Sequence, residues 1–267
     1  MSRVRSMSTP VPWDLLSSAY ADEVVPLLER YATDALRLAA PVTGARIVDV
    51  ACGPGTLAIL AAQQGHLVDA IDFSAGMIER FEARRLTLGL DNVTAQVGDG
   101  QALPFRDATY GAGFSMFGLM FFADRAKGFS ELRRVLLPGA RAVVSSWQRI
   151  DDHPVLAAVL ASVWATAAID PDDLPLSTPE QCREEMSASF ADVEVIEISH
   201  TERYETAAAA WASLERTLPP LVLMRRELGD EKWAKVSVVA SETMTRTLGD
   251  GPPELVMSAW LTVGVAR

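Results

Sequence analysis

The sequence predicts an α/β protein built on a seven-stranded, mostly parallel sheet. Apolar runs of β type alternate with helix-forming segments through the first half of the chain, a pattern typical of parallel strands joined by right-handed crossovers. Two later runs, Val193–Ser199 and Glu254–Val265, have strand character and complete the predicted sheet. The first five strands are expected near residues 46–50, 67–72, 92–97, 110–116 and 140–147.

Helical spacing of apolar residues predicts the elements between and around these strands. A helical segment from Trp13 to Leu38 precedes the first strand, and Pro26 marks a start or a break within it. The segment 206–248 is expected to form two helices, broken at Pro219-Pro220 or near Gly229. Further helices are expected near residues 56–64, 75–88, 124–136 and 154–168, with another start at 178–181.

Composition limits the classes of function. The 267 residues carry 35 acidic and 24 basic side chains, a formal net charge of −11, which disfavours nucleic acid as a partner. No apolar run reaches the length of a membrane span. The two cysteines, Cys52 and Cys182, form no metal-type cluster, so we expect no metal site and a reduced, cytoplasmic protein.

The turn after the first strand is the most informative local feature. The strand carries Asp49 and leads through Cys52, Gly53 and Gly55 into a helix-forming sequence. Glycine lets the backbone approach a ligand closely, and a helix N-terminus offers free N–H groups. This arrangement predicts a floor for a nucleotide-like ligand.

Acidic residues end the next two strands. Asp72 can accept hydrogen bonds from both hydroxyls of a ribose, and Asp99 from the exocyclic amine of adenine. Each has a structural alternative, because Asp72 precedes a predicted helix and can cap it, and Asp99 can hold an Asx-type turn. Ligands of parallel sheets bind beyond the carboxyl ends of the strands, where all these residues are expected.

With these motifs in order, the chain resembles the class I S-adenosylmethionine-dependent methyltransferases, of the small-molecule type that includes the ubiquinone and menaquinone C-methyltransferases. The resemblance spans roughly residues 13–148 and implies a Rossmann-like, doubly wound sheet with S-adenosylmethionine as cofactor. The matching pieces are Asp49-x-Ala51-Cys52-Gly53-x-Gly55-Thr56, Ile71-Asp72-Phe73-Ser74-x-x-Met77, 98–105, 114–119 and Glu131-x-x-Arg134-Val135-Leu136-x-Pro138-Gly139.

The resemblance also implies a division of the chain. Residues 13–150 would form the cofactor-binding core, and 191–205 with 252–267 would complete its sheet. A helical cap inserted near the C-terminus, residues 153–190 and 206–250, would cover the site of the methyl acceptor.

The residues expected to bind the cofactor belong to these motifs or lie beside them. Many family members have Gly where this chain has Ala51, and the methyl group narrows the gap to the cofactor. Asp49 would orient the turn and face the cofactor amine directly or indirectly. The expected cofactor-binding set is Tyr20, Ala51, Cys52, Gly53, Gly55, Asp72, Phe73, Met77, Asp99, Gly100, Gln101 and Met116.

The acceptor site is expected beside the fourth and fifth strands. Phe117, Phe121 and Trp147 would form a largely apolar pocket, which suits an apolar or aromatic small molecule. No catalytic residue is assigned, because an already nucleophilic acceptor needs no base. If a hydroxyl acceptor did need one, the nearest groups in the sequence would be Asp151, Asp152 and His153.

Two alternatives remain open. Gly53-x-Gly55-x-x-Ala58, followed by Asp72, also fits a dinucleotide fingerprint and hence an NAD(P)-dependent oxidoreductase. No Tyr-x-x-x-Lys pair or comparable set for hydride transfer is visible. The second alternative is a protein that binds the cofactor but has lost turnover.

Overall fold

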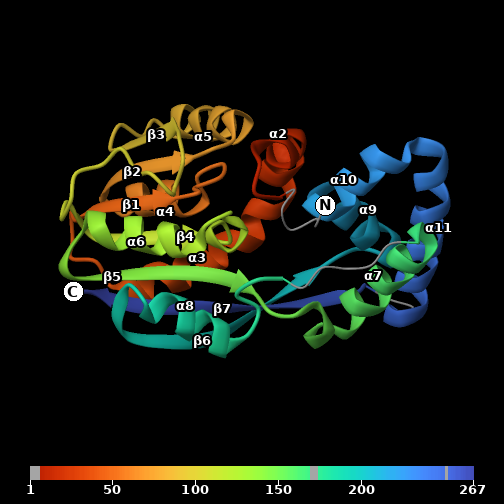
Figure 1. Cartoon of the computed structure of the whole chain (residues 1–267). Helices are drawn as coiled ribbons and strands as arrows, with labels where there is room; N and C mark the ends of the chain where they lie inside the picture. Colours follow the sequence, from red (N-terminus) through yellow and green to blue (C-terminus); the bar gives the residue numbers. More distant parts are fainter. Residues whose placement is uncertain (1–6, 169–173, 250–251) are drawn as a thin grey trace.

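The computed structural model describes residues 7–168, 174–249 and 252–267. Within this part of the chain, seven strands form one sheet in the order β3-β2-β1-β4-β5-β7-β6 (Figure 1). The first five strands pair in parallel, and β7 is antiparallel to both β5 and β6. The predicted fold class is therefore confirmed. The strands are β1 (Arg46–Val50), β2 (Leu67–Asp72), β3 (Val93–Val97), β4 (Tyr110–Met116), β5 (Leu136–Trp147), β6 (Phe190–Arg203) and β7 (Glu254–Ala266).

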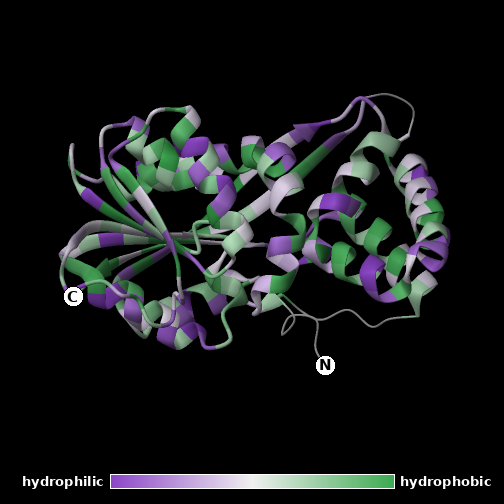
Figure 2. Ribbon diagram, turned by 90° about the horizontal axis from the view of Figure 1, so that it is seen from above, coloured by the Kyte–Doolittle hydropathy of each residue, from purple (hydrophilic) through white to green (hydrophobic). Residues whose placement is uncertain are grey.

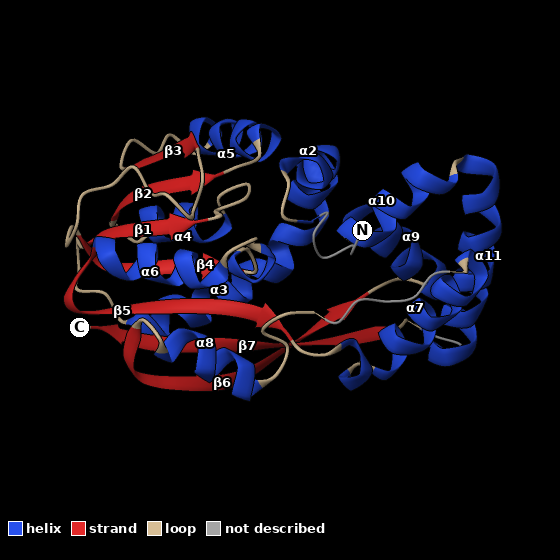
Figure 3. Cartoon of the chain, viewed as in Figure 1, coloured by secondary structure: helices blue, strands red, loops and turns tan. Residues whose placement is uncertain are grey.

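Helices cover both faces of the sheet, because its central strands are apolar on both sides. In β1, Ile47 belongs to one buried cluster and Val48 to another. The first cluster includes residues of α3 (Val25–Ala39) and α4 (Thr56–Gln63), and the second includes residues of α6 (Arg125–Val135). Figure 3 shows these layers, with α5 (Ala75–Thr87) beside β2 and β3.

A second body of helices lies beyond the carboxyl ends of the parallel strands. It comprises α7 (Pro154–Ala167), α9 (Ala207–Thr217), α10 (Pro219–Leu228) and α11 (Asp230–Leu248). These helices share a buried cluster of their own, which includes Val159, Trp211 and Trp233. The long strands β6 and β7 extend from the sheet into this body, here called the cap. Figure 2 shows that hydrophobic and hydrophilic residues alternate along the helices of the cap.

The structure refines two predictions for the C-terminal half. Residues 206–248 form three helices, because the chain breaks both at Pro219 and at Gly229, whose φ is 74°. Helix α8 (Pro179–Ser187) lies within the segment predicted as cap, yet it packs on the sheet. Its Cys182 and Met186, one turn apart on the same face, join the cluster around Phe190 of β6.

The N-terminal helical segment contains an irregular turn. A π-helical turn, η1 (Tyr20–Val24), separates α2 (Pro10–Ala19) from α3. The N–H of Val25 donates to the carbonyl of Tyr20, and the next residue, Pro26, has no N–H to continue an α-helical pattern. The sequence signal at Pro26 thus corresponds to the start of α3, where the helix type changes without a full break in the chain.

Candidate functional site

A cavity of about 920 Å³, including the space at its mouth, lies at the carboxyl ends of β1, β2 and β4. Because the strand order reverses between β1 and β4, this is the place where open α/β sheets bind ligands. Nearly all of the residues expected to bind the cofactor line it: Tyr20, Ala51, Cys52, Gly53, Asp72, Phe73, Met77, Asp99, Gly100, Gln101 and Met116.

Gly55 is the exception among these residues. It does not line the cavity, and a Cβ at this position would lie 2.4 Å from the Phe81 ring. Its φ is 82°, which L side chains rarely adopt. The glycine therefore serves the turn and its packing on α5, and its contact with the cofactor stays a prediction.

The turn between β1 and α4 forms the floor of the cavity. The N–H of Cys52 donates to the carbonyl of Ile71 (3.1 Å), and the N–H of Gly53 donates to Oδ2 of Asp72 (2.8 Å). Ala51 has a φ of 56°, in the left-handed region that costs an L-residue about 1–2 kcal/mol. Strained backbone held by surrounding bonds is typical of ligand sites.

Asp72 holds the turn and the segment that leads into α5, whose N-cap is Ser74 and not Asp72. Its Oδ1 accepts the N–H of Ser74 (2.9 Å), close to the start of α5, and its Oδ2 accepts the N–H of Gly53. Each carboxylate oxygen can accept a further hydrogen bond, and the side chain lines the cavity. Burial raises the pKa of Asp72 to about 6 against the opposing effect of these two backbone bonds.

Asp49 carries a polar atom without a partner. Its Oδ2 accepts the N–H of Ala58 (3.1 Å), but its Oδ1 is buried and has no hydrogen-bond partner among the described residues. Burial, and then the charge of Asp72, raise the pKa of Asp49 to about 8. Because Asp49 lines the cavity, a ligand that brings a donor or a positive charge would satisfy this oxygen.

The loop after β3 forms another wall. Oδ1 of the exposed Asp99 accepts the N–H of Gln101 (2.8 Å), the Asx-type turn considered above, and Asp99 also lines the cavity. Glu131 and Arg134 of α6 hold this loop through hydrogen bonds to its backbone. Oε2 of Glu131 accepts the N–H of Leu103 (2.8 Å), and Arg134 donates to the Leu103 carbonyl (3.0 Å). The motif containing this Glu–Arg pair therefore positions the loop.

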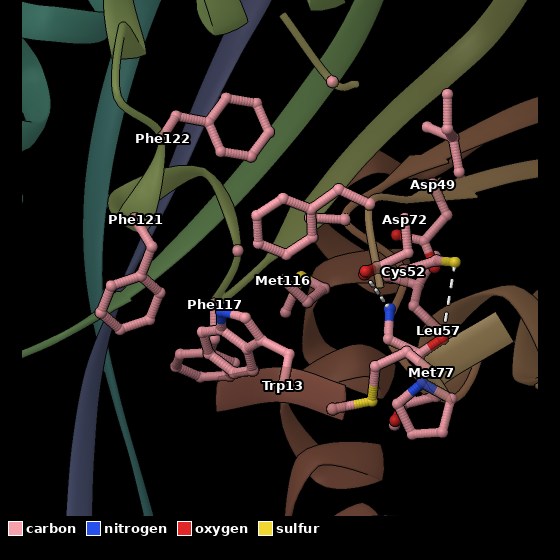
Figure 4. A pocket seen from close by; sticks show the side chains of 18 of the residues that line it. Trp13, Asp49, Cys52, Leu57, Asp72, Met77, Met116, Phe117, Phe121 and Phe122 are labelled. Carbon is pink, nitrogen blue, oxygen red and sulfur yellow. Dashed lines mark hydrogen bonds between the residues drawn. The ribbon is translucent and has the colours of Figure 1, made fainter. Parts of the chain in front are cut away.

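A second cavity, of about 1520 Å³ including its mouth, lies between the sheet and the cap. Phe117, Phe121 and Trp147 line it as expected, together with residues of α7, α9 and the start of α10. Four aromatic residues line both cavities, namely Trp13, Tyr20, Phe117 and Phe121, and we call them the aromatic neck. Figure 4 shows three of these side chains, Trp13, Phe117 and Phe121, together with Met116.

The aromatic neck is built from two separate segments of the chain, the N-terminal helical segment and the residues that follow β4. Phe117 stacks on Trp147, with ring centroids 4.0 Å apart, and its N–H donates to Oγ of Ser145 (2.9 Å). These contacts hold Phe117 at a φ of 57°. From α2, Trp13 packs against Phe121 with centroids 5.3 Å apart. The neck therefore forms only when the N-terminal helical segment folds over the end of β4.

The remaining candidates for a base lie elsewhere. Asp151 and Asp152 are exposed in the short helix η3 (Ile150–Asp152), and His153 is buried with its Nε2 unpartnered, but none of the three lines either cavity. Glu23 and Glu202, which sequence reasoning missed, do line the second cavity. Within the described residues, no group of three His, Cys, Asp or Glu could hold a metal ion.

Comparison with known proteins identifies the central part of the chain. Residues 47–139 match a family described as a methyltransferase domain. This segment is similar to methyltransferase domains. It is similar to demethylmenaquinone methyltransferase from Clavibacter sepedonicus, at 42% identity over 139 residues that cover 49% of this chain and 55% of that protein. The chain thus spans about half the length of this relative, and the chain resembles class I methyltransferases of small molecules.

Solved structures extend the likeness to the fold of most of the chain. The YcgJ protein from Bacillus subtilis superposes with a TM-score of 0.62 at 18% identity, covering 88% of this chain and 97% of that one. Phosphoethanolamine N-methyltransferase 2 from Haemonchus contortus, solved with S-adenosylhomocysteine, has a TM-score of 0.56 at 17% identity. The match covers 89% of this chain and 53% of that one. The matched methyltransferase domain ends at Gly139, so the cap walls of the second cavity lie outside it.

Proposed function

We propose that this protein transfers a methyl group from S-adenosylmethionine to a small, apolar or aromatic organic molecule. The observation that carries the proposal is the pair of cavities that share the aromatic neck. The first cavity has a strained turn and three carboxylates at the strand ends, and the second cavity is mostly apolar. The matched methyltransferase domain and the names of the relatives support the same reaction.

The residues of the first cavity fit this cofactor. The unpartnered Oδ1 of Asp49 would receive its ammonium group, and the free acceptor capacity of Asp72 would receive the ribose hydroxyls. Asp99 would accept the adenine amine, and the backbone of 51–53 would lie beneath the amino-acid end. When bound, the cofactor supplies an electrophilic methyl group on a sulfonium. The methyl of Ala51 and the thiol of Cys52 would form small walls of this site.

The protein would then act mainly by positioning. Trp13, Tyr20, Phe117 and Phe121 would exclude water from the neck and hold the acceptor atom in line with the methyl–sulfur bond. Their ring faces also favour a neighbouring cation. Burial and the charge of Asp72 raise the pKa of the Tyr20 hydroxyl, so it stays protonated and can donate a hydrogen bond at neutral pH. We assign no general base.

We further propose that the cap segments 153–168 and 206–249 cover the acceptor, that nucleic acid is not a partner, and that the protein acts in the cytoplasm. The net charge of −11 supports the second point, and the two buried, unpaired cysteines support the third. In the described part of the chain, helices that combine the length and the apolar character of a membrane span are absent.

Two measurements test the proposed function. Calorimetric titration should give binding of S-adenosylmethionine and no binding of NAD⁺ or NADP⁺; the reverse result would make the protein an oxidoreductase candidate. Methyl transfer from labelled cofactor should then be screened against apolar phenols, quinols and amines. Cofactor binding without transfer to any of them would favour a binding protein over an enzyme.

A further inference from the structure

The walls of the second cavity carry charge of one sign only. Glu23 and Glu202 line it, whereas none of its described lining residues is Lys, Arg or His. The same holds for the described lining of the first cavity, where the charged residues are Asp49, Asp72 and Asp99. A ligand in the second cavity therefore meets carboxylates with no basic side chain among the described walls to balance a negative group.

Both glutamates pair with arginines that do not line the cavity. Glu23, on the π-helical turn, accepts from Nε of Arg216 (2.9 Å), and Glu202, on β6, forms an ion pair with Arg30. Neither arginine lines the cavity, and their side chains are 49% and 40% exposed, respectively. Each carboxylate thus lines the cavity, whereas its partly exposed guanidinium partner does not.

The hydroxyl groups beside Glu23 add acceptors to this wall. Ser213 Oγ donates its hydrogen to Oε2 of Glu23 (2.8 Å), and Thr217 Oγ1 donates to the carbonyl of Ser213 (2.8 Å). Since a hydroxyl has a single hydrogen, both groups can offer only lone pairs to a ligand. These hydroxyls and the two carboxylates therefore form an acceptor wall, defined as Glu23, Glu202, Ser213 and Thr217.

We propose that the acceptor wall determines substrate specificity: the methyl acceptor is an apolar ring molecule whose polar group is a hydrogen-bond donor, a hydroxyl or an amine, and which carries no anionic group. A donor would satisfy the wall, and Trp147, Trp164 and Leu214 would cover the apolar ring. A carboxylate or phosphate would lose its hydration against like charge without a counter-ion. The methyl-acceptor role rests on the proposed function, whereas the charge preference concerns binding alone.

Four naphthalene probes of one ring size test this preference by calorimetry at pH 7.5, with and without S-adenosylhomocysteine. They are 2-naphthol, 2-naphthylmethylamine, 2-methoxynaphthalene and 2-naphthoate, which differ in donor capacity and charge. We expect the naphthol and the amine to bind at least tenfold more tightly than the methoxy compound and the naphthoate. Naphthoate binding equal to that of naphthol, or binding of none of the probes, would overturn the proposal.

Two variants assign the preference to the wall. Glu202→Gln leaves the charge of Arg30 unbalanced, so the ratio of amine to naphthoate affinity should fall at least tenfold; Glu23→Gln should lower it through Arg216. Glu197→Gln, an equal charge change at an exposed site on β6 that lines neither cavity, should leave it unchanged. An unaltered ratio in both wall variants would contradict the assignment. Absence of S-adenosylhomocysteine binding, with probe discrimination intact, would instead refute only the proposed function.

Discussion

At the scale of single residues, Asp72 joins the turn, the start of α5 and the cavity. We expect Asp72→Asn to weaken S-adenosylhomocysteine binding at least tenfold, because a hydrogen bond to a charged group contributes about 1.5–3 kcal/mol. An amide keeps the size of the carboxylate and can still accept from one of the two N–H donors, Gly53 or Ser74. Calorimetry measures the affinity, and thermal melting measures the stability.

The matched control for this variant is Asp91→Asn, an equal charge change at an exposed site outside both cavities. It should change neither quantity. If Asp72→Asn kept the wild-type dissociation constant, Asp72 would be only a structural acceptor for the turn.

A second residue-scale prediction concerns Ala51 and Gly118. A Cβ added at Gly118 would lie 2.4 Å from Cβ of Ala51, so Gly118→Ala should destabilise the protein by about 1–3 kcal/mol. Ala51→Gly removes the methyl group that an alanine at position 118 would meet, and it also removes the left-handed strain at position 51. Alone, it should be neutral or stabilising. The double variant should recover most of the loss in chemical denaturation. Additive effects would mean that the two methyl groups do not meet.

At the scale of elements, α6 controls a loop of the first cavity. Glu131→Gln should weaken the clamp on Leu103 while leaving the sheet intact, because the loop loses a charge-assisted hydrogen bond. Hydrogen exchange should accelerate at residues 98–105, and S-adenosylhomocysteine affinity should fall severalfold. Glu185→Gln, which breaks a similar pair with Arg125 between α6 and α8, is the matched control. Equal exchange in the loop of both variants would contradict this role.

The order of the strands and helices explains which site residues could be predicted from the sequence. The turn at Ala51–Gly53 and the acids Asp72 and Asp99 were predictable, because parallel strands bring their carboxyl ends to one edge whatever the distant packing. The packing of Gly55 against Phe81 was not predictable, since Phe81 comes from another helix. Helix α8 was placed in the cap because chain order does not specify which body a short helix joins.

The acceptor wall could not be predicted from the sequence either, because its residues come from segments that are far apart in the chain. Glu23 and Ser213 are separated by 190 positions and meet only after the cap has folded against the N-terminal helical segment. Neither residue lies in a motif, and an isolated acid or serine on a helix is usually solvated. Trp147 was predictable as part of the second cavity because it ends a strand beside the site, like Phe117 at the end of β4.

At the scale of the whole molecule, two buried acids make stability depend on pH. The pKa of Asp49 is about 8 and that of Asp72 about 6, both above the ordinary value of 3.8. Between the unfolded and folded pKa values, the native state holds protons that the unfolded state releases. The free energy of unfolding therefore falls as pH rises through this window, and the effect of Asp49 is complete above about pH 8.

Asp49→Asn isolates this contribution, because the amide does not titrate. We expect the stability of wild type relative to Asp49→Asn to decline steadily from pH 5 to pH 8 in urea denaturation, and then to level. Acids with lowered pKa values, such as Glu131 and Glu23, lose their stabilising contribution only at lower pH and are common to both proteins. A difference that stays constant over this range would mean that Asp49 is ionised in the folded state. A cationic ligand would then find the carboxylate already charged, and its binding would release no proton from Asp49.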